Sequence, residues 1–117
     1  MKKLEDLTKI LKALSDDGRI RIIALLKEKN DLCVCELREL IGLSQPTISS
    51  HLKILENAGL ITYQKDGRWV NYRINTDLDE DQDKLMDQVF SILENIREIK
   101  EECKKVRRID RKIICKK

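Results

Sequence analysis

Cys33 and Cys35, which are separated by a single residue, are the strongest candidates for chemistry in this sequence. Thiolates bind soft, thiophilic ions, so this pair could hold such an ion or sense oxidation. In an extended strand the two side chains lie on one side, whereas in an α-helix they are about 200° apart around the axis. Both sulfurs can therefore face one ion only if the segment is extended or if the start of the next helix unwinds. The alternative is that both cysteines are small buried hydrophobic residues.

The sequence has two further cysteines, Cys103 and Cys115. Cys103 lies in a repeating apolar pattern, so packing is its default role, and Cys115 lies in a basic segment and is expected to be exposed. The first residues lack the apolar stretch of a secretion signal, and no apolar run approaches membrane-spanning length. We therefore expect a cytoplasmic protein whose cysteines serve as thiols, ion ligands or sensors rather than as structural disulfides.

The stretch that follows the cysteine pair, residues 36–60, divides into two short helical patterns. Gly42 tolerates the left-handed conformation that closes a helix, and the Ser44 hydroxyl can cap the next one. A joint this short forces a sharp angle, so the apolar residues of the first helix pack against Ile48, Leu52 and Leu55. This pattern predicts a helix-turn-helix over residues 35–57, with residues 44–57 as the recognition helix. An ordinary helical hairpin with a solvated polar face is the alternative.

The polar side of the second helix is rich in hydroxyl, amide and imidazole groups, which suit base edges and phosphates in a DNA major groove. The candidate DNA-binding residues on it are Ser44, Gln45, Thr47, Ser49, Ser50, His51 and Lys53.

Residues 60–65 and 69–74 alternate polar and apolar side chains around Asp66-Gly67, which predicts a β-hairpin over residues 60–74 with its turn at that pair. Pairing across this turn sets Lys65 beside Arg68 at the tip, where two cations could reach DNA phosphates. A helix-turn-helix followed at once by such a hairpin is a winged helix, and the combination is more specific than either part.

Two amphipathic helices flank this unit. Leucines at helical spacing predict a helix over residues 3–14, and a mostly apolar pattern predicts a second, buried helix after it. Apolar residues at alternating spacings of four and three predict a heptad seam on one helix over residues 82–106. A small winged domain cannot cover so long a seam, so we expect a homodimer built from the first and last helices. The seam consists of Leu85, Val89, Ile92, Ile96, Ile99, Cys103 and Val106.

The 117 residues suffice for one domain, and the predicted class is α+β, mainly α, with about five helices and a two-stranded wing. Charge is unevenly distributed: residues 1–103 carry 16 Lys and Arg against 20 Asp and Glu, a net of −4, whereas residues 104–117 carry eight against one, a net of +7. Residues 31–73 are neutral, with five charges of each sign. The basic tail, residues 107–117, could supply electrostatic attraction to DNA, or it could be solvated.

The sequence resembles the ArsR/SmtB family of small metalloregulatory repressors. The resemblance is carried by residues 12–16, 32–37, 43–55, 58–61 and 67–70. It implies a dimeric winged-helix repressor that sits on an operator and leaves it when a metal or metalloid binds. Cys33 and Cys35 match the sensing motif of the arsenic-responsive branch, which favours their role as ligands over the packing interpretation. Arg38 stands where that branch often has a third cysteine, so Cys103 and Cys115 become the candidates. His51 is the only histidine, which speaks against the zinc site of other members.

We therefore hypothesise that As(III) or Sb(III) binds Cys33 and Cys35 with a third sulfur from Cys103 or Cys115, and that binding releases operator DNA. A Cd(II)- or Pb(II)-sensing member of the same family and a thiol-redox repressor are alternatives. An enzyme is disfavoured, because the sequence has no second histidine to act as a base and no glycine-rich phosphate loop. A coiled-coil interaction module that has lost DNA binding is a further alternative.

Overall fold

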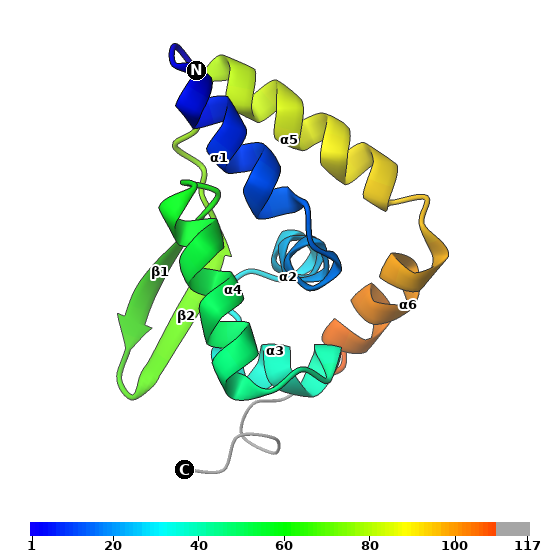
Figure 1. Ribbon diagram of the computed structural model, residues 1–117. Helices are drawn as coiled ribbons and strands as arrows, with labels where there is room; N and C mark the ends of the chain where they lie inside the picture. Colours follow the sequence, from blue (N-terminus) through cyan, green and yellow to red (C-terminus); the bar gives the residue numbers. More distant parts are fainter. Residues whose placement is uncertain (110–117) are drawn as a thin grey trace.

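The computed structural model describes residues 1–109, and helix α2 lies at its centre with the other helices around it (Figure 1). The elements in chain order are α1 (Leu4–Leu14), α2 (Asp17–Glu28), α3 (Val34–Ile41), α4 (Gln45–Asn57), β1 (Ile61–Asp66), β2 (Trp69–Ile74), α5 (Glu80–Leu93) and α6 (Arg97–Val106). This order confirms the predicted winged helix, with six helices in the described residues. Cys115 and most of the predicted basic tail lie outside the described residues.

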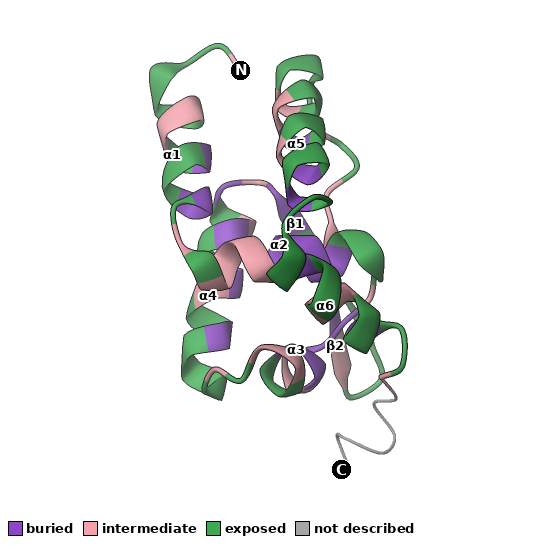
Figure 2. Ribbon diagram, turned by 90° about the vertical axis from the view of Figure 1, so that its right-hand side faces the viewer, coloured by how far each residue is buried: buried purple, intermediate pink, exposed green. Residues whose placement is uncertain are grey.

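Helix α2 is buried because it is apolar on most of its sides, as the sequence predicts. Ile22, Ile23, Leu25 and Leu26 have no exposed surface. Asp16 caps the helix by accepting a hydrogen bond from the backbone N–H of Arg19 at 3.1 Å. Figure 2 shows buried residues on the helix faces that point to the centre and exposed residues on the outer faces.

Two local signals set the angle between α3 and α4. Gly42 ends α3 in the left-handed region, with φ of 82°, and Ser44 caps α4, where its hydroxyl accepts from the backbone N–H of Thr47 at 3.4 Å. The predicted helix-turn-helix is therefore present, with the start of α3 one residue earlier than expected. Leu37 of α3 and Ile48 and Leu52 of α4 are buried in the core beside α2.

The hairpin pairs Ile61 with Ile74 and Asp66 with Trp69. The predicted turn at Asp66-Gly67 is therefore wrong by one position, and the two turn residues are Gly67 and Arg68. Gly67 alone of these two has a positive φ, 61°, which is the pattern of a type II′ turn. As a consequence Lys65 lies opposite Val70 rather than beside Arg68.

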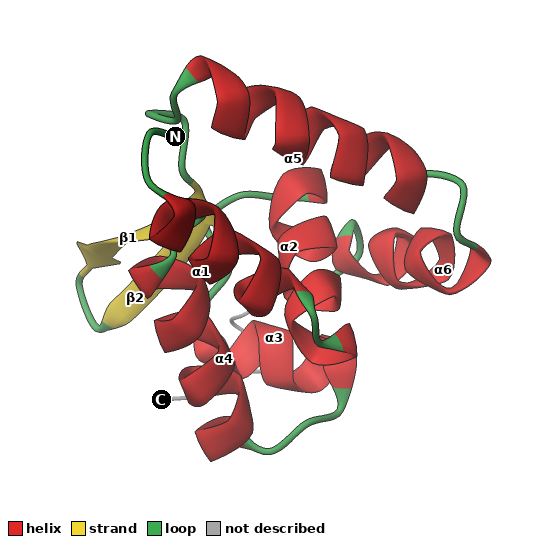
Figure 3. Ribbon diagram, turned by 45° about the horizontal axis from the view of Figure 1, so that its top comes forward, coloured by secondary structure: helices red, strands yellow, loops and turns green. Residues whose placement is uncertain are grey.

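The predicted single helix over residues 82–106 is also wrong. Helix α5 ends at Leu93 and α6 begins at Arg97, and α6 turns back against α2 and α3 (Figure 3). Ile99 and Val106 are thereby buried within one subunit. The seam residues of α6 fill the core of their own chain instead of extending an interface.

Helices α1 and α5 project toward the same end of the molecule (Figures 1 and 2). They carry large apolar side chains on their outer faces: Leu4 is 80% exposed and Ile92 is 55% exposed, and Leu11 is exposed as well. Large exposed apolar side chains on both helices make their outer faces candidates for an interaction surface.

None of the helices in residues 1–109 is both long enough and apolar enough to cross a membrane.

Candidate functional site

The outer face of α4 is polar and accessible. Pro46 in the first turn and the Ser44 cap fix the start of the helix, and the Ser44 and Thr47 hydroxyls are 2.9 Å apart. Buried Ile48, Leu52 and Leu55 fix its inner face. The predicted DNA-binding residues that are exposed on α4 and at its cap are Ser44, Gln45, Thr47, Ser49, Ser50 and Lys53.

His51 does not belong to that outer face, and its predicted position there is corrected. Its side chain is only 13% exposed and turns toward the start of α2, where Nε2 lies 3.4 Å from Oδ2 of Asp16. Its Nδ1 lies 3.3 Å from Nη1 of Arg19. The hydrogen bond from the backbone N–H of Arg19 lowers the pKa of the Asp16 carboxyl, and the positive charge of Arg19 lowers it further. Asp16 and Arg19 were not identified from the sequence as partners of the recognition helix.

The wing presents the other two predicted DNA-binding residues, Lys65 and Arg68, and both are exposed. Arg68 lies in the turn, with its guanidinium carbon 5.4 Å from the centroid of the Trp69 ring. Such a contact restricts the arginine side chain without removing its charge. The wing therefore offers two cations on one projecting hairpin.

Cys33 occupies the N-cap of α3, and its backbone is extended, with φ of −95° and ψ of 170°. Only 4% of the residue is exposed. Cys35 lies two residues later inside the first helical turn, so the backbone changes from extended to helical between the two sulfurs. The buried carboxylate of Glu36 accepts a hydrogen bond from the backbone N–H of Cys33 at 3.1 Å, which holds this first turn closed.

The residues just before Cys33 form hydrogen bonds with the wing. Asp31 and Leu32 exchange backbone hydrogen bonds with Tyr72, each 2.9 Å long, and Leu32 forms a β-bridge with it. The Asp31 carboxylate also receives hydrogen bonds from the Arg73 guanidinium, the shortest 2.6 Å long. Asp31 is the one residue other than glycine with a positive φ, 68°, in the described part of the chain. The cysteine pair at the start of α3 thus follows directly on a segment bonded to strand β2, a link that no sequence pattern indicated.

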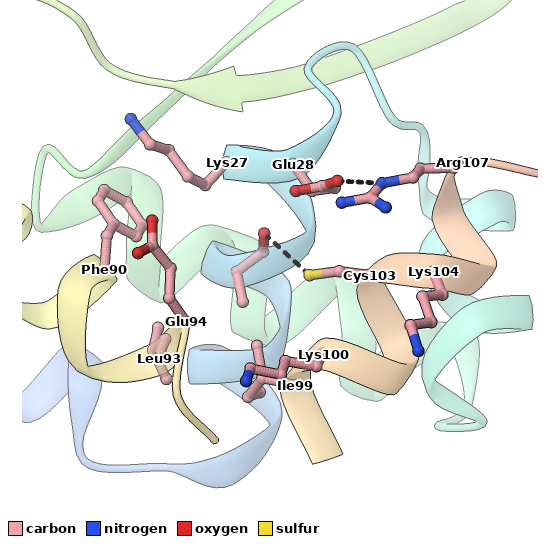
Figure 4. A pocket seen from close by; sticks show the side chains of 11 residues that line it. Lys27, Glu28, Phe90, Leu93, Glu94, Ile99, Lys100, Cys103, Lys104 and Arg107 are labelled. Carbon is pink, nitrogen blue, oxygen red and sulfur yellow. Dashed lines mark hydrogen bonds and ion pairs between the residues drawn. The ribbon is translucent and has the colours of Figure 1, made fainter. Parts of the chain in front are cut away.

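Cys103 lies elsewhere, on α6 beside a cavity of about 260 Å³ between α2, α5 and α6 (Figure 4). Its Sγ lies 3.9 Å from the backbone oxygen of Ala24. Phe90, Leu93 and Ile99 supply apolar lining. Burial raises the pKa of the Cys103 thiol, and the Glu28 carboxylate adds to the rise.

The redox states of the cysteines differ. Cys33 and Cys103 are reduced thiols, as expected, whereas Cys35 is disulfide-bonded, which corrects the expectation for that residue. Within residues 1–109 the structure brings no three His, Cys, Asp or Glu side chains together in a group that could hold an ion. Cys103 therefore does not join Cys33 and Cys35 in this conformation. The role of Cys115 falls outside the described residues.

The raised pKa of Cys103 makes its reactivity testable. At a pH near the ordinary value of a thiol, a raised pKa means a smaller thiolate fraction, and the thiolate is the form that is alkylated. We expect iodoacetamide to modify Cys103 at least severalfold more slowly in the native reduced protein than in the same protein unfolded in urea. Peptide mapping by mass spectrometry measures this rate. Equal rates in the two states would show that the Cys103 thiol is not shielded and that its pKa is not raised.

The geometry defines a winged helix-turn-helix protein: two helices joined at a glycine cap, a polar outer face on the second, and a hairpin with cations after it. Residues 16–63 match the family described as "Bacterial regulatory protein, arsR family". The chain is 38% identical to the arsenical resistance operon repressor of Escherichia coli (strain K12), over 69% of each chain. It is 39% identical to the cadmium resistance transcriptional regulatory protein CadC homolog of Staphylococcus aureus, over 73% of this chain and 68% of that one.

A similar solved structure is the homodimeric winged helix-turn-helix DNA-binding domain of a possible ArsR-family transcriptional regulator from Mycobacterium bovis. It has a TM-score of 0.65 and 26% identity, and the match covers 78% of this chain and 81% of that one. Reduced HlyU from Vibrio cholerae has a TM-score of 0.58 and 29% identity, over 74% and 90% of the two chains. The chain belongs to the arsR family of bacterial transcriptional regulators.

Proposed function

We propose that this protein is a homodimeric transcriptional repressor that binds operator DNA and leaves it when As(III) or Sb(III) binds Cys33 and Cys35. The observation that carries this proposal is the position of the two cysteines across the N-terminus of α3, the helix that holds the recognition helix in place. The relationship to arsenical resistance operon repressors, 38% identical in Escherichia coli and 44% identical in Staphylococcus aureus, supports it.

In this proposal α4 lies in the major groove and the wing follows the backbone. The exposed amide of Gln45 offers one donor and one acceptor together, the pair that adenine matches in the major groove. The hydroxyls of α4 contact base edges or phosphates, and Lys53, Lys65 and Arg68 contact phosphates. Residues 31–73 carry no net charge, so these few cations contribute most of the attraction from this part of the chain.

The donor set of the cysteine pair suits a thiophilic ion. Trivalent arsenic takes three sulfurs in a pyramid, so Cys33 and Cys35 need one more thiolate, and Cys103 and Cys115 are the candidates. Cys103 would have to leave its place beside Ala24, whereas Cys115 can be tested directly by substitution. Arsenite is As(OH)3 in neutral solution, so each thiol proton leaves with one hydroxide as water, and three As–S bonds replace three As–O bonds. A divalent ion bound by the same thiols would instead release their protons to solution.

Bringing both sulfurs to one ion changes the start of α3. Cys33 is already extended, so the segment from Val34 to Cys35 has to leave the helix, and the hydrogen bond from Cys33 to Glu36 is lost. This movement reaches α4 through the eight-residue helix α3 and reaches the wing through the bridge between Leu32 and Tyr72. Both DNA-binding elements thus move when the cysteines bind an ion.

A titration tests the proposal as a whole. The purified protein, kept fully reduced so that Cys35 is a thiol, is bound to a fluorescent duplex from its own promoter region. Arsenite, antimonite, Cd(II), Pb(II) and Zn(II) are then added separately while anisotropy reports release. Release by arsenite at the lowest concentration supports the proposal, and release by none of them contradicts it.

The wing contact leads to a separate prediction. Removing one cation that contacts a phosphate should weaken binding to all duplexes alike and reduce the slope of log affinity against log salt by about one. We therefore expect this change for Arg68→Ala in anisotropy titrations at several salt concentrations. Arg97→Ala is a matched control, because Arg97 is exposed at the start of α6, away from α4 and the wing. If both variants bind like the wild type at every salt concentration, the wing does not contact the backbone.

Two alternatives have specific support. The similarity to the CadC homolog, a cadmium resistance regulator, supports Cd(II) as an alternative inducer, and the titration above separates Cd(II) from arsenite. The disulfide at Cys35 supports the alternative of a thiol-redox repressor, in which oxidation rather than ion binding moves α3. Intact mass spectrometry after peroxide and after arsenite distinguishes the redox alternative, because only the second treatment adds the mass of arsenic.

A further inference from the structure

His51 connects the recognition helix to the corner between α1 and α2. Its imidazole contacts two side chains of that corner, Asp16 through Nε2 at 3.4 Å and Arg19 through Nδ1 at 3.3 Å. The other polar residues predicted to bind DNA on α4 are exposed, whereas this one is largely enclosed. Because the His51 side chain points inward from α4, the proposed recognition helix, its role is not contact with a base.

Both partners of His51 are held by the backbone. Arg19 donates from Nε to the oxygen of Ala13 at 2.7 Å and from Nη2 to the oxygen of Lys12 at 3.2 Å. The Asp16 carboxylate accepts the backbone N–H of Arg19 as the cap of α2. His51 therefore contacts a fixed frame that includes the end of α1 and the start of α2.

Gly18 allows the close approach of the ring. A Cβ atom built on Gly18 would lie 2.9 Å from Nε2 of His51 and 3.1 Å from its Cδ2, closer than such contacts normally occur. The imidazole thus packs directly on the backbone of the first turn of α2. This contact and the two polar contacts together restrict the position of the ring.

The chemistry of the two contacts is complementary. The guanidinium of Arg19 can only donate, so Nδ1 of His51 accepts, and a neutral ring then carries its proton on Nε2, which faces the Asp16 carboxylate. One tautomer satisfies both partners. Such directional contacts specify the rotation of a helix more sharply than the apolar packing of Ile48, Leu52 and Leu55.

We propose that His51 is a positioning residue for operator recognition, which fixes the rotation of α4 about its axis against the Asp16–Arg19 corner. This inference rests on the proposed function in that it assumes sequence-specific DNA binding by α4. Base-edge contacts require accurate placement, whereas phosphate contacts tolerate more variation. Loss of the contact should therefore reduce specific binding and leave non-specific binding in place.

The test compares His51→Leu with His51→Gln. Leucine fills similar space without polar groups, whereas the glutamine amide can accept from Arg19 and donate to Asp16. We expect His51→Leu to lower operator affinity by roughly tenfold, the size of one lost specific contact, and to leave affinity for a scrambled duplex of equal length within twofold. His51→Gln should recover most of the operator affinity. Anisotropy with the full-length reduced protein measures both duplexes.

Arg19→Leu separates positioning from direct contact, because Arg19 lies on α2 and not on the polar face of α4. We expect the same operator-selective loss for Arg19→Leu and no further loss in the double variant. The inference is overturned if His51→Leu binds the operator like the wild type, or if its affinity for the operator and for the scrambled duplex falls equally. Additive losses of operator affinity in the double variant would overturn it as well.

Two further outcomes are distinguished. If circular dichroism shows that His51→Leu is unfolded, His51→Asn takes its place, since its shorter polar side chain cannot satisfy both partners and should show the same operator-selective loss. If the wild type prefers no duplex from its promoter region over the scrambled one, the proposed function fails, because operator binding by the unaltered protein is measured first.

Discussion

Cys33→Ser is expected to abolish the response to arsenite while leaving operator binding intact. In the wild type, binding of arsenite should weaken operator affinity by roughly 5- to 150-fold, which corresponds to about 1–3 kcal/mol of coupling between two sites. By linkage, operator DNA should weaken arsenite binding by the same factor. A serine oxygen does not replace a soft thiolate toward a thiophilic ion, so both effects should disappear together.

Serine at position 33 should preserve the fold of the DNA-binding elements. Cys33 occupies the N-cap of α3 with an extended backbone, and serine is among the preferred residues at that position. The backbone N–H of residue 33 remains available to the Glu36 carboxylate. We therefore expect the operator affinity of Cys33→Ser without arsenite to lie within about twofold of the wild type, since its cap should be at least as good.

The measurement is the operator dissociation constant with and without saturating arsenite, under a phosphine reductant that does not itself bind the ion. Cys103→Ser and Cys115→Ser are measured in parallel, because whichever of them supplies the third sulfur should lose most of the response. If Cys33→Ser is still released by arsenite at the wild-type concentration, the cysteine pair at α3 is not the sensing site.

The helix-turn-helix could be predicted because its signals are local. Gly42 and Ser44 each determine one helix end through the backbone, independently of distant contacts. The hairpin was predicted for the same reason, but the pair of turn residues was not. Asp66-Gly67 and Gly67-Arg68 both place a glycine in a two-residue turn, so the sequence allows either. The structure has the second, in which Asp66 pairs with Trp69.

The C-terminal helix was predicted wrongly because a heptad seam looks the same whether it packs on a partner or on its own chain. No glycine or proline marks the break after Leu93, and burial of Ile99 and Val106 favours the folded-back arrangement. The orientation of His51 did have a signal. His51 lies three residues after buried Ile48 and four before buried Leu55, a spacing that places it on the inner edge of α4.

The proposed ion-sensing site was predictable only in part, because its two cysteines are close in sequence and the contacts around them are not. The spacing of Cys33 and Cys35 indicated that a shared ion conflicts with a helix, and the structure places the start of α3 between them. The pairing of Leu32 with Tyr72 and of Asp31 with Arg73 joins positions about 40 residues apart, which no pattern along the chain could indicate. These tertiary contacts bring the wing into the proposed mechanism.

Dimerisation is expected to depend on the exposed apolar side chains of α1 and α5. The outer face of α5 exposes the apolar side chain of Ile92, as α1 exposes that of Leu4, and a related domain from Mycobacterium bovis is homodimeric. If this face is the dimer interface, Ile92→Glu buries an unpaired carboxylate there, which costs several kcal/mol. We expect the dimer dissociation constant to rise by roughly 100-fold or more, since tenfold corresponds to about 1.4 kcal/mol.

Operator affinity should fall when the dimer dissociates. A single subunit contacts one half-site and loses the gain from binding two half-sites together, which is typically about 100-fold or more. Analytical ultracentrifugation gives the oligomeric state, and anisotropy gives the operator affinity of the same samples. Asp87→Lys is the control: it changes charge by more than Ile92→Glu does, at an exposed position of α5 about 140° around the axis from Ile92. A folded Ile92→Glu protein that remains dimeric, or an Asp87→Lys protein that dissociates equally, would place the interface on another face and leave the exposed apolar residues of α1 and α5 to a different partner.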